Sequence, residues 1–126
     1  MGKDQTNLLA EYKAHLVTWN KTHNLISKKQ AQKIDDHIAD SLIISPFLNK
    51  NIIDLGSGGG LPGIPLAIIN PDKEFYLIES NTKKSSFLLH TTSRLSLENT
   101  SVINQRIEKV ETKTFPESFD IVCRAV

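Results

Sequence analysis

The chain has 126 residues, of which 39% are hydrophobic and 23% charged, with a net charge of +1. That length fits one domain with a core of its own, and the near-average apolar content excludes a wholly disordered chain. There is no apolar run of the about 18 residues that a membrane span requires and no signal-peptide pattern, and the single cysteine, Cys123, excludes an internal disulfide and a multi-cysteine metal site. We therefore expect a cytoplasmic protein that does not interact with membranes.

The first 50 residues have a helical pattern. Apolar and aromatic residues recur every three or four positions over 4–19, which predicts an amphipathic helix whose Tyr12 and Trp19 belong to the core rather than stack on a base. A second short helix is predicted over 34–44. We interpret residues 1–50 as a helical N-terminal extension.

The pattern changes after residue 50 to alternating strands and helices. Four strands are predicted, separated by helices over 62–69 and 82–95 and by a short helical stretch over 106–110. The predicted strands are 51–55, 74–79, 101–104 and 119–123. Strands alternating with helices of this length are typical of right-handed βαβ units, so residues 51–126 are predicted to form a parallel Rossmann-like α/β sheet flanked by helices. Because the chain stops soon after the fourth strand, we expect this sheet to be incomplete.

Between the two predicted helices lies a basic segment, residues 21–33. It contains four lysines and no acidic residue; they are Lys21, Lys28, Lys29 and Lys33. Such a segment either binds phosphates or is a solvated connection between helices, and charge alone favours the second interpretation.

A glycine-rich loop follows the first predicted strand directly. It reads Gly56-Ser57-Gly58-Gly59-Gly60 and is preceded by Asp54. Glycines at such a turn allow a sharp bend and a close approach of ligand to backbone. No Lys-Ser/Thr pair follows, which excludes a nucleotide-triphosphate loop, and Leu61 stands where a dinucleotide fingerprint has its third glycine.

An acidic residue, Glu79, ends the second predicted strand. At that position a carboxylate accepts hydrogen bonds from both ribose hydroxyls of a nucleoside. Asp54, by contrast, suits a ligand with an ammonium or sulfonium group. Asp54, the glycines and Glu79 together predict a pocket for S-adenosyl-L-methionine, with the amino-acid end near Asp54 and the adenine over the third strand. A glycine-rich turn without a cofactor is the alternative.

Several further residues allow two interpretations. Arg124 follows the fourth strand and either grips an anion in the pocket or pairs with Asp120 or Glu79. Lys83 and Lys84 lie in the first turn of a predicted helix, which indicates a nearby anion or simply solvent exposure. Cys123 is a possible nucleophile, although a small buried role is favoured because no activating partner is evident.

His37 and Asp40 lie one helical turn apart. No third ligand accompanies them, so they are interpreted as making a hydrogen bond on the helix surface or between helices, and no metal is expected.

Several short motifs along the chain resemble those of the RsmG/GidB family of bacterial methyltransferases. The Leu61-Pro62-Gly63-Ile64-Pro65 run after Asp54–Gly60 is the most distinctive. Further similarity lies in Trp19-Asn20-Lys21 with Asn24-Leu25, in 37–42, in Lys83-Lys84 with Phe87-Leu88, in 106–108, and in Phe119-Asp120 with Arg124-Ala125. The resemblance covers about residues 7–125 and the N-terminal two-thirds of the family.

The resemblance implies a class I methyltransferase that modifies guanine N7 in the 530 loop of 16S ribosomal RNA in the small ribosomal subunit. We expect the protein to be a monomer. By position, Gly56 and Leu61 would line the methionine side of the cofactor. Ile107 and Glu108 would flank the adenine. Arg124, the predicted catalytic residue, would sit at the junction of cofactor and substrate. With the residues above, the cofactor set is Asp54, Gly56, Ser57, Gly58, Gly60, Leu61, Glu79, Ile107, Glu108 and Arg124, and the RNA set is Lys28, Lys29, Lys83 and Lys84.

The sequence leaves two alternatives open. One is a methyltransferase acting on a small molecule or a protein. The basic segment 21–33 is weak evidence against this alternative. The other is a truncated, non-catalytic cofactor-binding module.

Overall fold

The computed structural model describes residues 2–56 and 58–123. Within this part of the chain, four strands form one sheet in the order β3-β2-β1-β4, and every neighbouring pair is parallel. The strands are β1 (Asn51–Leu55), β2 (Glu74–Ile78), β3 (Thr100–Ile103) and β4 (Asp120–Val122). The predicted parallel α/β sheet is therefore confirmed; β1 has the predicted bounds, and no end of the other strands differs by more than one residue.

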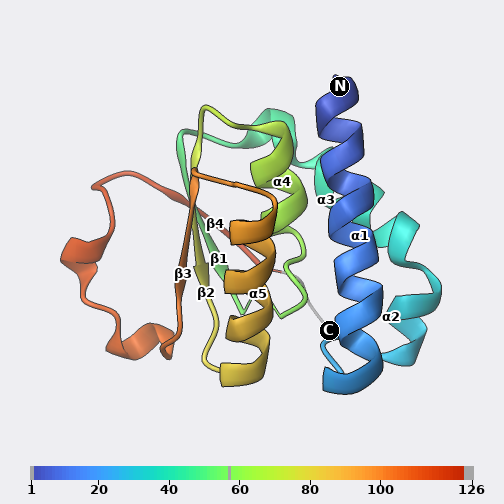
Figure 1. Cartoon of the computed structure of the whole chain (residues 1–126). Helices are drawn as coiled ribbons and strands as arrows, with labels where there is room; N and C mark the ends of the chain where they lie inside the picture. The colour runs from blue at the N-terminus through green and yellow to red at the C-terminus, as the bar shows by residue number, and fades with distance from the viewer. Residues whose placement is uncertain (1, 57, 124–126) are drawn as a thin grey trace.

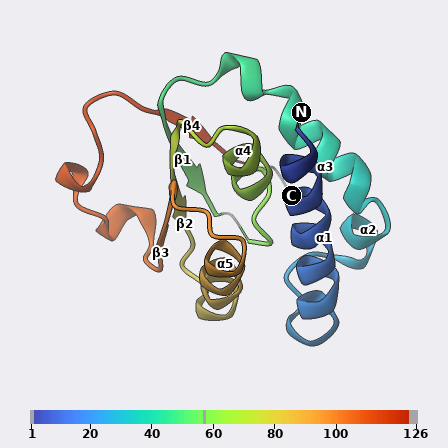
Figure 2. The same cartoon turned by 45° about the horizontal axis from the view of Figure 1, so that its top comes forward.

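One face of the sheet is covered by α4 (Gly63–Ile69) and α5 (Thr82–Arg94). A second helical layer lies outside them, formed by α1 (Lys3–His23), α2 (Lys28–Gln32) and α3 (Ile34–Ile43) (Figures 1 and 2). The helix α1 contacts both α4 and α5, and α3 contacts α4.

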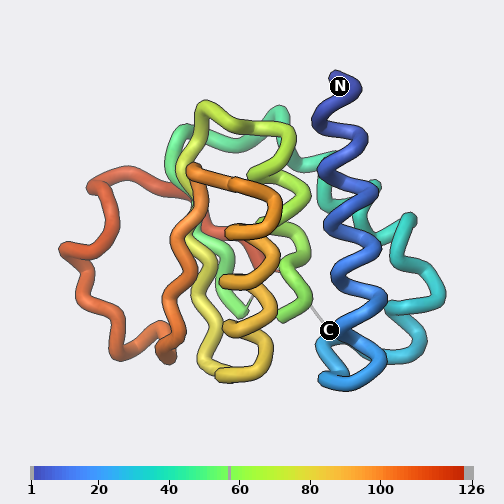
Figure 3. The backbone as a smooth tube through the Cα atoms, viewed as in Figure 1, coloured from blue at the N-terminus to red at the C-terminus, as the bar shows by residue number. Residues whose placement is uncertain are grey.

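The long connection between β3 and β4 lies on the other side of the sheet, away from the helices (Figure 3). It contains the 3-10 turns η2 (Ile107–Lys109) and η3 (Thr112–Thr114). Phe115 from this connection packs edge-on against Tyr76 of β2, with ring centroids 5.4 Å apart. The strand β2 therefore has apolar contacts on both of its faces, as is typical of strands in a parallel sheet.

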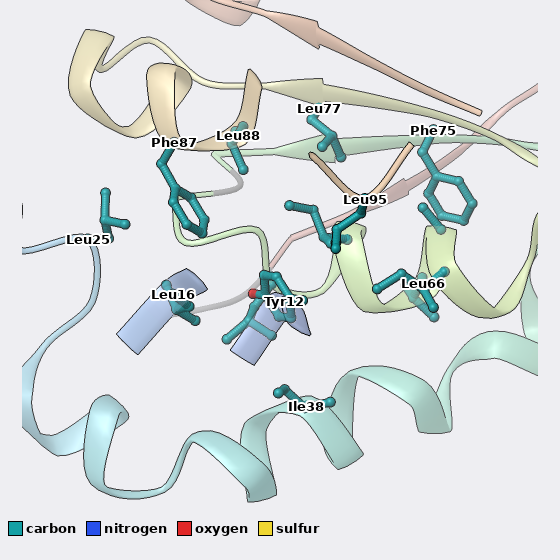
Figure 4. Close-up of a cluster of buried hydrophobic side chains, with 14 of the residues drawn as sticks. Tyr12, Leu16, Leu25, Ile38, Leu66, Phe75, Leu77, Phe87, Leu88 and Leu95 are labelled. Carbon is teal, nitrogen blue, oxygen red and sulfur yellow. The ribbon is translucent and has the colours of Figure 1, made fainter. Parts of the chain in front are cut away.

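A single hydrophobic cluster joins the N-terminal helices to the sheet layer (Figure 4). Tyr12 and Leu16 of α1 and Ile38 of α3 belong to the same cluster as Phe75 of β2 and Phe87 of α5. The segments before and after residue 50 differ in sequence pattern, but they share one continuous core. The prediction that Tyr12 is a core residue is confirmed, since its side chain has no exposed surface.

Local signals explain where the helices begin and end. Asn81 caps α5, because its side-chain oxygen accepts a hydrogen bond from the backbone N–H of Lys84 at 3.0 Å. The helix α1 continues to His23, beyond the expected Trp19, and stops where Asn24 adopts a left-handed conformation.

The prediction that residues 21–33 form a solvated connection is wrong in part. Ser27 and Gln30 form a reciprocal capping box that starts α2, with Gln30 N–H donating to Ser27 Oγ at 3.1 Å. Leu25 is only 3% exposed and belongs to the core cluster. The Ser-x-x-Gln spacing was a usable signal for this helix.

Cys123 is exposed, so the expectation that it is buried is wrong. The strand β4 pairs only with β1 among the described residues, and Ile121 within β4 is also largely exposed. None of the helices in the described ranges is long and apolar enough to cross a membrane.

Candidate functional site

The glycine loop leaves β1 at the carboxyl end of the sheet, where ligands of open α/β folds bind. Gly56, Gly58 and Gly60 all have positive φ angles, of 67°, 56° and 92°. L-residues with a Cβ rarely adopt this conformation, so the loop needs glycine at these positions for its backbone path. Gly56 N–H donates to the carbonyl of Ile78 at 2.8 Å, which ties the start of the loop to β2.

Only part of the loop faces open space. A Cβ on Gly56 would meet nothing within 4 Å, whereas a Cβ on Gly59 would lie 2.9 Å from Ile26 Cγ2 and 3.0 Å from Leu16 Cδ1. A Cβ on Gly60 would lie 2.6 Å from Ile64 Cδ1. Gly59 and Gly60 are therefore small because protein packs against the position that a Cβ would occupy. The predicted cofactor contacts of Gly56, Gly58 and Gly60 stay predictions.

Asp54 is fully buried beneath the loop. Its Oδ2 accepts a hydrogen bond from the backbone N–H of Gly63, the first residue of α4, at 2.9 Å. The side chain lines neither of the two clefts described below. A direct contact of Asp54 with a cofactor stays a prediction, and one of its observed contacts is with the start of α4.

Glu79 joins the two loops that follow β1 and β2. Its Oε1 accepts from Gly58 N–H at 2.8 Å and its Oε2 accepts from Asn81 N–H at 2.9 Å. The residue is 7% exposed. Each carboxylate oxygen has a second acceptor site, so these two bonds leave capacity for ribose hydroxyls.

A larger cleft of about 590 Å³ opens between the glycine loop and the turn that joins α1 to α2. We call it the lysine cleft, because three lysine side chains from three separate elements line it; they are Lys21, Lys28 and Lys84. On the loop side it is lined by Gly56, Gly58, Gly59 and Leu61. The structure thus brings predicted cofactor residues and predicted RNA-binding residues to one cleft.

A smaller cleft of about 250 Å³ lies on the other side of Gly56, over the ends of β1, β2 and β3. We call it the Ile107 cleft. It combines apolar side chains with polar ones; the lining residues are Leu55, Gly56, Ile78, Ser80, Gln105, Arg106, Ile107 and Glu108. Ile107 and Glu108 therefore lie where the predicted adenine would be.

The remaining predicted residues lie elsewhere. Lys29, Lys33 and Lys83 are exposed and line neither cleft. Ser57 and Arg124 lie outside the described residues, so their predicted roles stay predictions. In the described part of the chain there is no group of three or more potential metal ligands, and His37 and Asp40 belong to no such group.

Sequence reasoning missed the contribution of the turn after α1. Asn20 Oδ1 accepts from Ile26 N–H at 2.8 Å, which shapes the turn, and Asn20, Asn24 and Ile26 all line the lysine cleft. The Trp19-Asn20-Lys21 and Asn24-Leu25 motifs were the available signal.

Aromatic rings form a seam between the helices α1 and α5. Trp19 packs edge-on against Phe87 at 5.6 Å, and His90 lies 5.5 Å from His15. Partial burial, then the neighbouring charges of His90 and Arg94, lower the pKa of His15 below its ordinary value of 6.5, and Glu11 opposes this shift.

The model of one protein family matches residues 5–126 of this chain. That family is GidB, rRNA small subunit methyltransferase G. The chain belongs to the GidB family. This confirms the resemblance drawn from the motifs.

Relatives in the GidB family support the match. The chain is 46% identical over 104 residues to ribosomal RNA small subunit methyltransferase G of Dichelobacter nodosus, covering 80% of this chain and 49% of that protein. It is 48% identical over 108 residues to the protein of the same name from Shewanella amazonensis, covering 84% and 52%. The chain thus spans about half the length of the curated relatives it matches, against the two thirds expected.

A solved structure supports the fold. Precorrin-6y C5,15-methyltransferase from Geobacter metallireducens superimposes with a TM-score of 0.60 at 14% identity, covering 81% of this chain and 50% of that one. At this identity the similarity concerns the fold alone, and it agrees with the predicted Rossmann-like class I methyltransferase architecture.

Proposed function

We propose that this GidB chain binds S-adenosyl-L-methionine and takes part in methylation of guanine N7 in the 530 loop of 16S ribosomal RNA, in the cytoplasm and as a monomer. One observation carries the proposal: two clefts of different character meet at Gly56, at the carboxyl ends of parallel strands. In open α/β folds this is where a nucleoside-containing cofactor binds.

The residues present fit that cofactor. In the proposal the adenine occupies the Ile107 cleft, whose isoleucines flank a flat apolar ring while Glu108 and Gln105 offer polar groups to its edge. The ribose lies against the spare acceptor sites of Glu79. The methionine part passes Gly56, which lines both clefts, into the lysine cleft.

When bound, this cofactor supplies an electrophilic methyl group on a sulfonium centre for in-line transfer to a nucleophile. Guanine N7 has a free lone pair and no proton, so the chain needs no general base for this acceptor. Its task is to keep the acceptor and the methyl carbon aligned at about 3–3.5 Å. Gly56 and Gly58, without side chains, leave space for that approach.

The lysine cleft is also the proposed entry of the RNA. Lys21, Lys28 and Lys84 would meet backbone phosphates, with Lys29 and Lys83 as outer contacts on the exposed surface beside them. Arg124 is proposed at the junction of cofactor and substrate.

Calorimetry with S-adenosyl-L-methionine and a methyl-transfer assay on small ribosomal subunits lacking this modification test the proposal. We expect binding in the calorimeter and label transferred to 16S rRNA at a guanine N7. Binding without transfer to any acceptor would identify a non-catalytic cofactor module. Transfer to a small molecule or protein but not to rRNA would replace the substrate, and absence of binding would overturn the proposal.

A further inference from the structure

The N-terminal helix reaches the glycine loop through one buried hydroxyl. Tyr12 of α1 has no exposed surface, and its hydroxyl donates a hydrogen bond of 2.6 Å to the backbone carbonyl of Gly59. The two residues are 47 positions apart in the sequence. Because Gly59 is buried too, losing this donor would leave its carbonyl without that partner away from water.

Apolar contacts surround this hydrogen bond. Leu16 of α1 and Ile26 of the following turn lie so close to Gly59 that no Cβ fits without displacing them, and the ring of Tyr12 lies against Gly60. Figure 4 shows Tyr12 and Leu16 directed from α1 into the shared core. The loop is thus packed against the helical extension over two consecutive residues.

The opposite side of the loop is held by the sheet. Glu79 accepts from Gly58 N–H, on the residue directly before Gly59. Tyr12 and Glu79 therefore bind adjacent residues of the loop from two directions, one through a carbonyl and the other through an N–H. Gly58 and Gly59 both line the lysine cleft, so the position of this segment sets the shape of the cleft wall.

We propose that Tyr12 is a positioning residue for the cofactor loop, and that α1 forms a necessary part of the cofactor site rather than a separate appendage. The inference rests on the proposed binding of S-adenosyl-L-methionine. Tyr12 acts through the backbone of Gly59 and needs no contact with the cofactor itself. Preorganisation of the loop lowers the ordering cost of binding, so loss of the hydroxyl should weaken affinity in a chain that remains folded.

The first test is Tyr12→Phe, which removes the hydroxyl and keeps the ring. Titration with S-adenosylhomocysteine, well below the melting temperature, should give a dissociation constant raised by about three- to tenfold. The control is Ser41→Ala, which removes another buried hydroxyl, one that donates to the carbonyl of His37 at 2.9 Å on α3. That variant should lose stability and keep wild-type affinity. An unchanged affinity for Tyr12→Phe would overturn the inference.

The second test needs no ligand, and so separates this inference from the proposed function. Hydrogen exchange of the Gly58 amide should become faster in Tyr12→Phe, while the Gly63 amide, bonded to Asp54 at the far end of the loop, should keep its protection relative to global unfolding. Equal changes at both amides would assign Tyr12 a general stabilising role and refute a positioning role. If the wild-type protein binds no cofactor but the exchange rates change as expected, the proposed function fails, while the positioning of the loop by Tyr12 is still supported.

The variant Gly59→Ala disturbs the same contact from the side of the loop. It replaces the Tyr12 variant in the test if that variant does not fold. Gly59 has no positive φ, so an alanine there is strained only by Leu16 and Ile26. We expect the same loss of affinity for S-adenosylhomocysteine. Wild-type affinity in this variant would contradict the dependence of the site on α1 packing.

Discussion

The carboxylate of Asp54, at the end of β1, accepts a hydrogen bond from the backbone N–H of Gly63 at the start of α4. The two ends of the glycine loop are thereby joined across its base at 2.9 Å. A negative charge also interacts favourably with the N-terminus of a helix. The acidic residue that the sequence assigned to a ligand is therefore also part of the structure that closes the loop.

This relationship makes Gly63 intolerant of a side chain. A Cβ there would lie 2.5 Å from Asp54 Oδ2 and 2.6 Å from Leu77 Cδ2. We expect Gly63→Ala to lower the free energy of unfolding by about 1–3 kcal/mol, measured by urea denaturation. Gly2→Ala is the control, because a Cβ on Gly2 meets nothing within 4 Å. Equal stability of the two variants would show that the loop base adapts without cost.

Glu79 is predicted to act on both the loop and the cofactor. Glu79→Ala removes the acceptor of Gly58 and Asn81 together with the proposed ribose contacts, so cofactor binding should weaken by about 1–3 kcal/mol and the melting temperature should fall. Calorimetry and thermal unfolding measure the two effects separately. Glu74→Ala, at the exposed start of β2, which ends directly before Glu79, should change neither. If Glu79→Ala left the dissociation constant unchanged, the ribose would not bind at Glu79.

The lysine cleft predicts which cations contribute most to RNA affinity. Lys28→Gln and Lys84→Gln should each weaken binding to an rRNA fragment and reduce the slope of log affinity against log salt by about one. Filter binding at several salt concentrations measures both quantities. Lys113→Gln, on η3 beside Glu111, provides the comparison. The same loss from all three variants would indicate nonspecific attraction instead of a defined path.

Acid should destabilise the seam between α1 and α5 through His15. Because the folded-state pKa of His15 is lowered, folding disfavours its protonated form. This contribution to stability is present above the ordinary pKa of 6.5 and is lost as the pH falls through the folded-state pKa. Lowering the pH from about 7.5 to about 5 should therefore reduce the melting temperature more in the wild type than in His15→Gln. Identical pH profiles for the two proteins would exclude His15 as the source.

The strand and helix pattern after residue 50 was predictable because it depends on local signals. Buried runs such as 51–55, the cap at Asn81 and the end of α4 before Asn70-Pro71 depend on a few neighbouring residues and not on the rest of the fold. The family motifs were equally visible, since they are short and contiguous. The capping box at Ser27 was present in the sequence as well, but the lysines around it favoured a solvated interpretation.

The roles of individual residues in the site depended on contacts between distant segments. Nothing near Tyr12 in the sequence indicates Gly59 as its partner, and nothing near Gly59 shows that Leu16 and Ile26 exclude a side chain there. The sequence alone determined a parallel α/β fold with a glycine loop and an acidic residue after the second strand, because hydrophobic periodicity and turn chemistry are local. Only the tertiary structure decided at which glycines a side chain would meet open space and at which it would meet protein, because packing brings α1 and the loop together across the core.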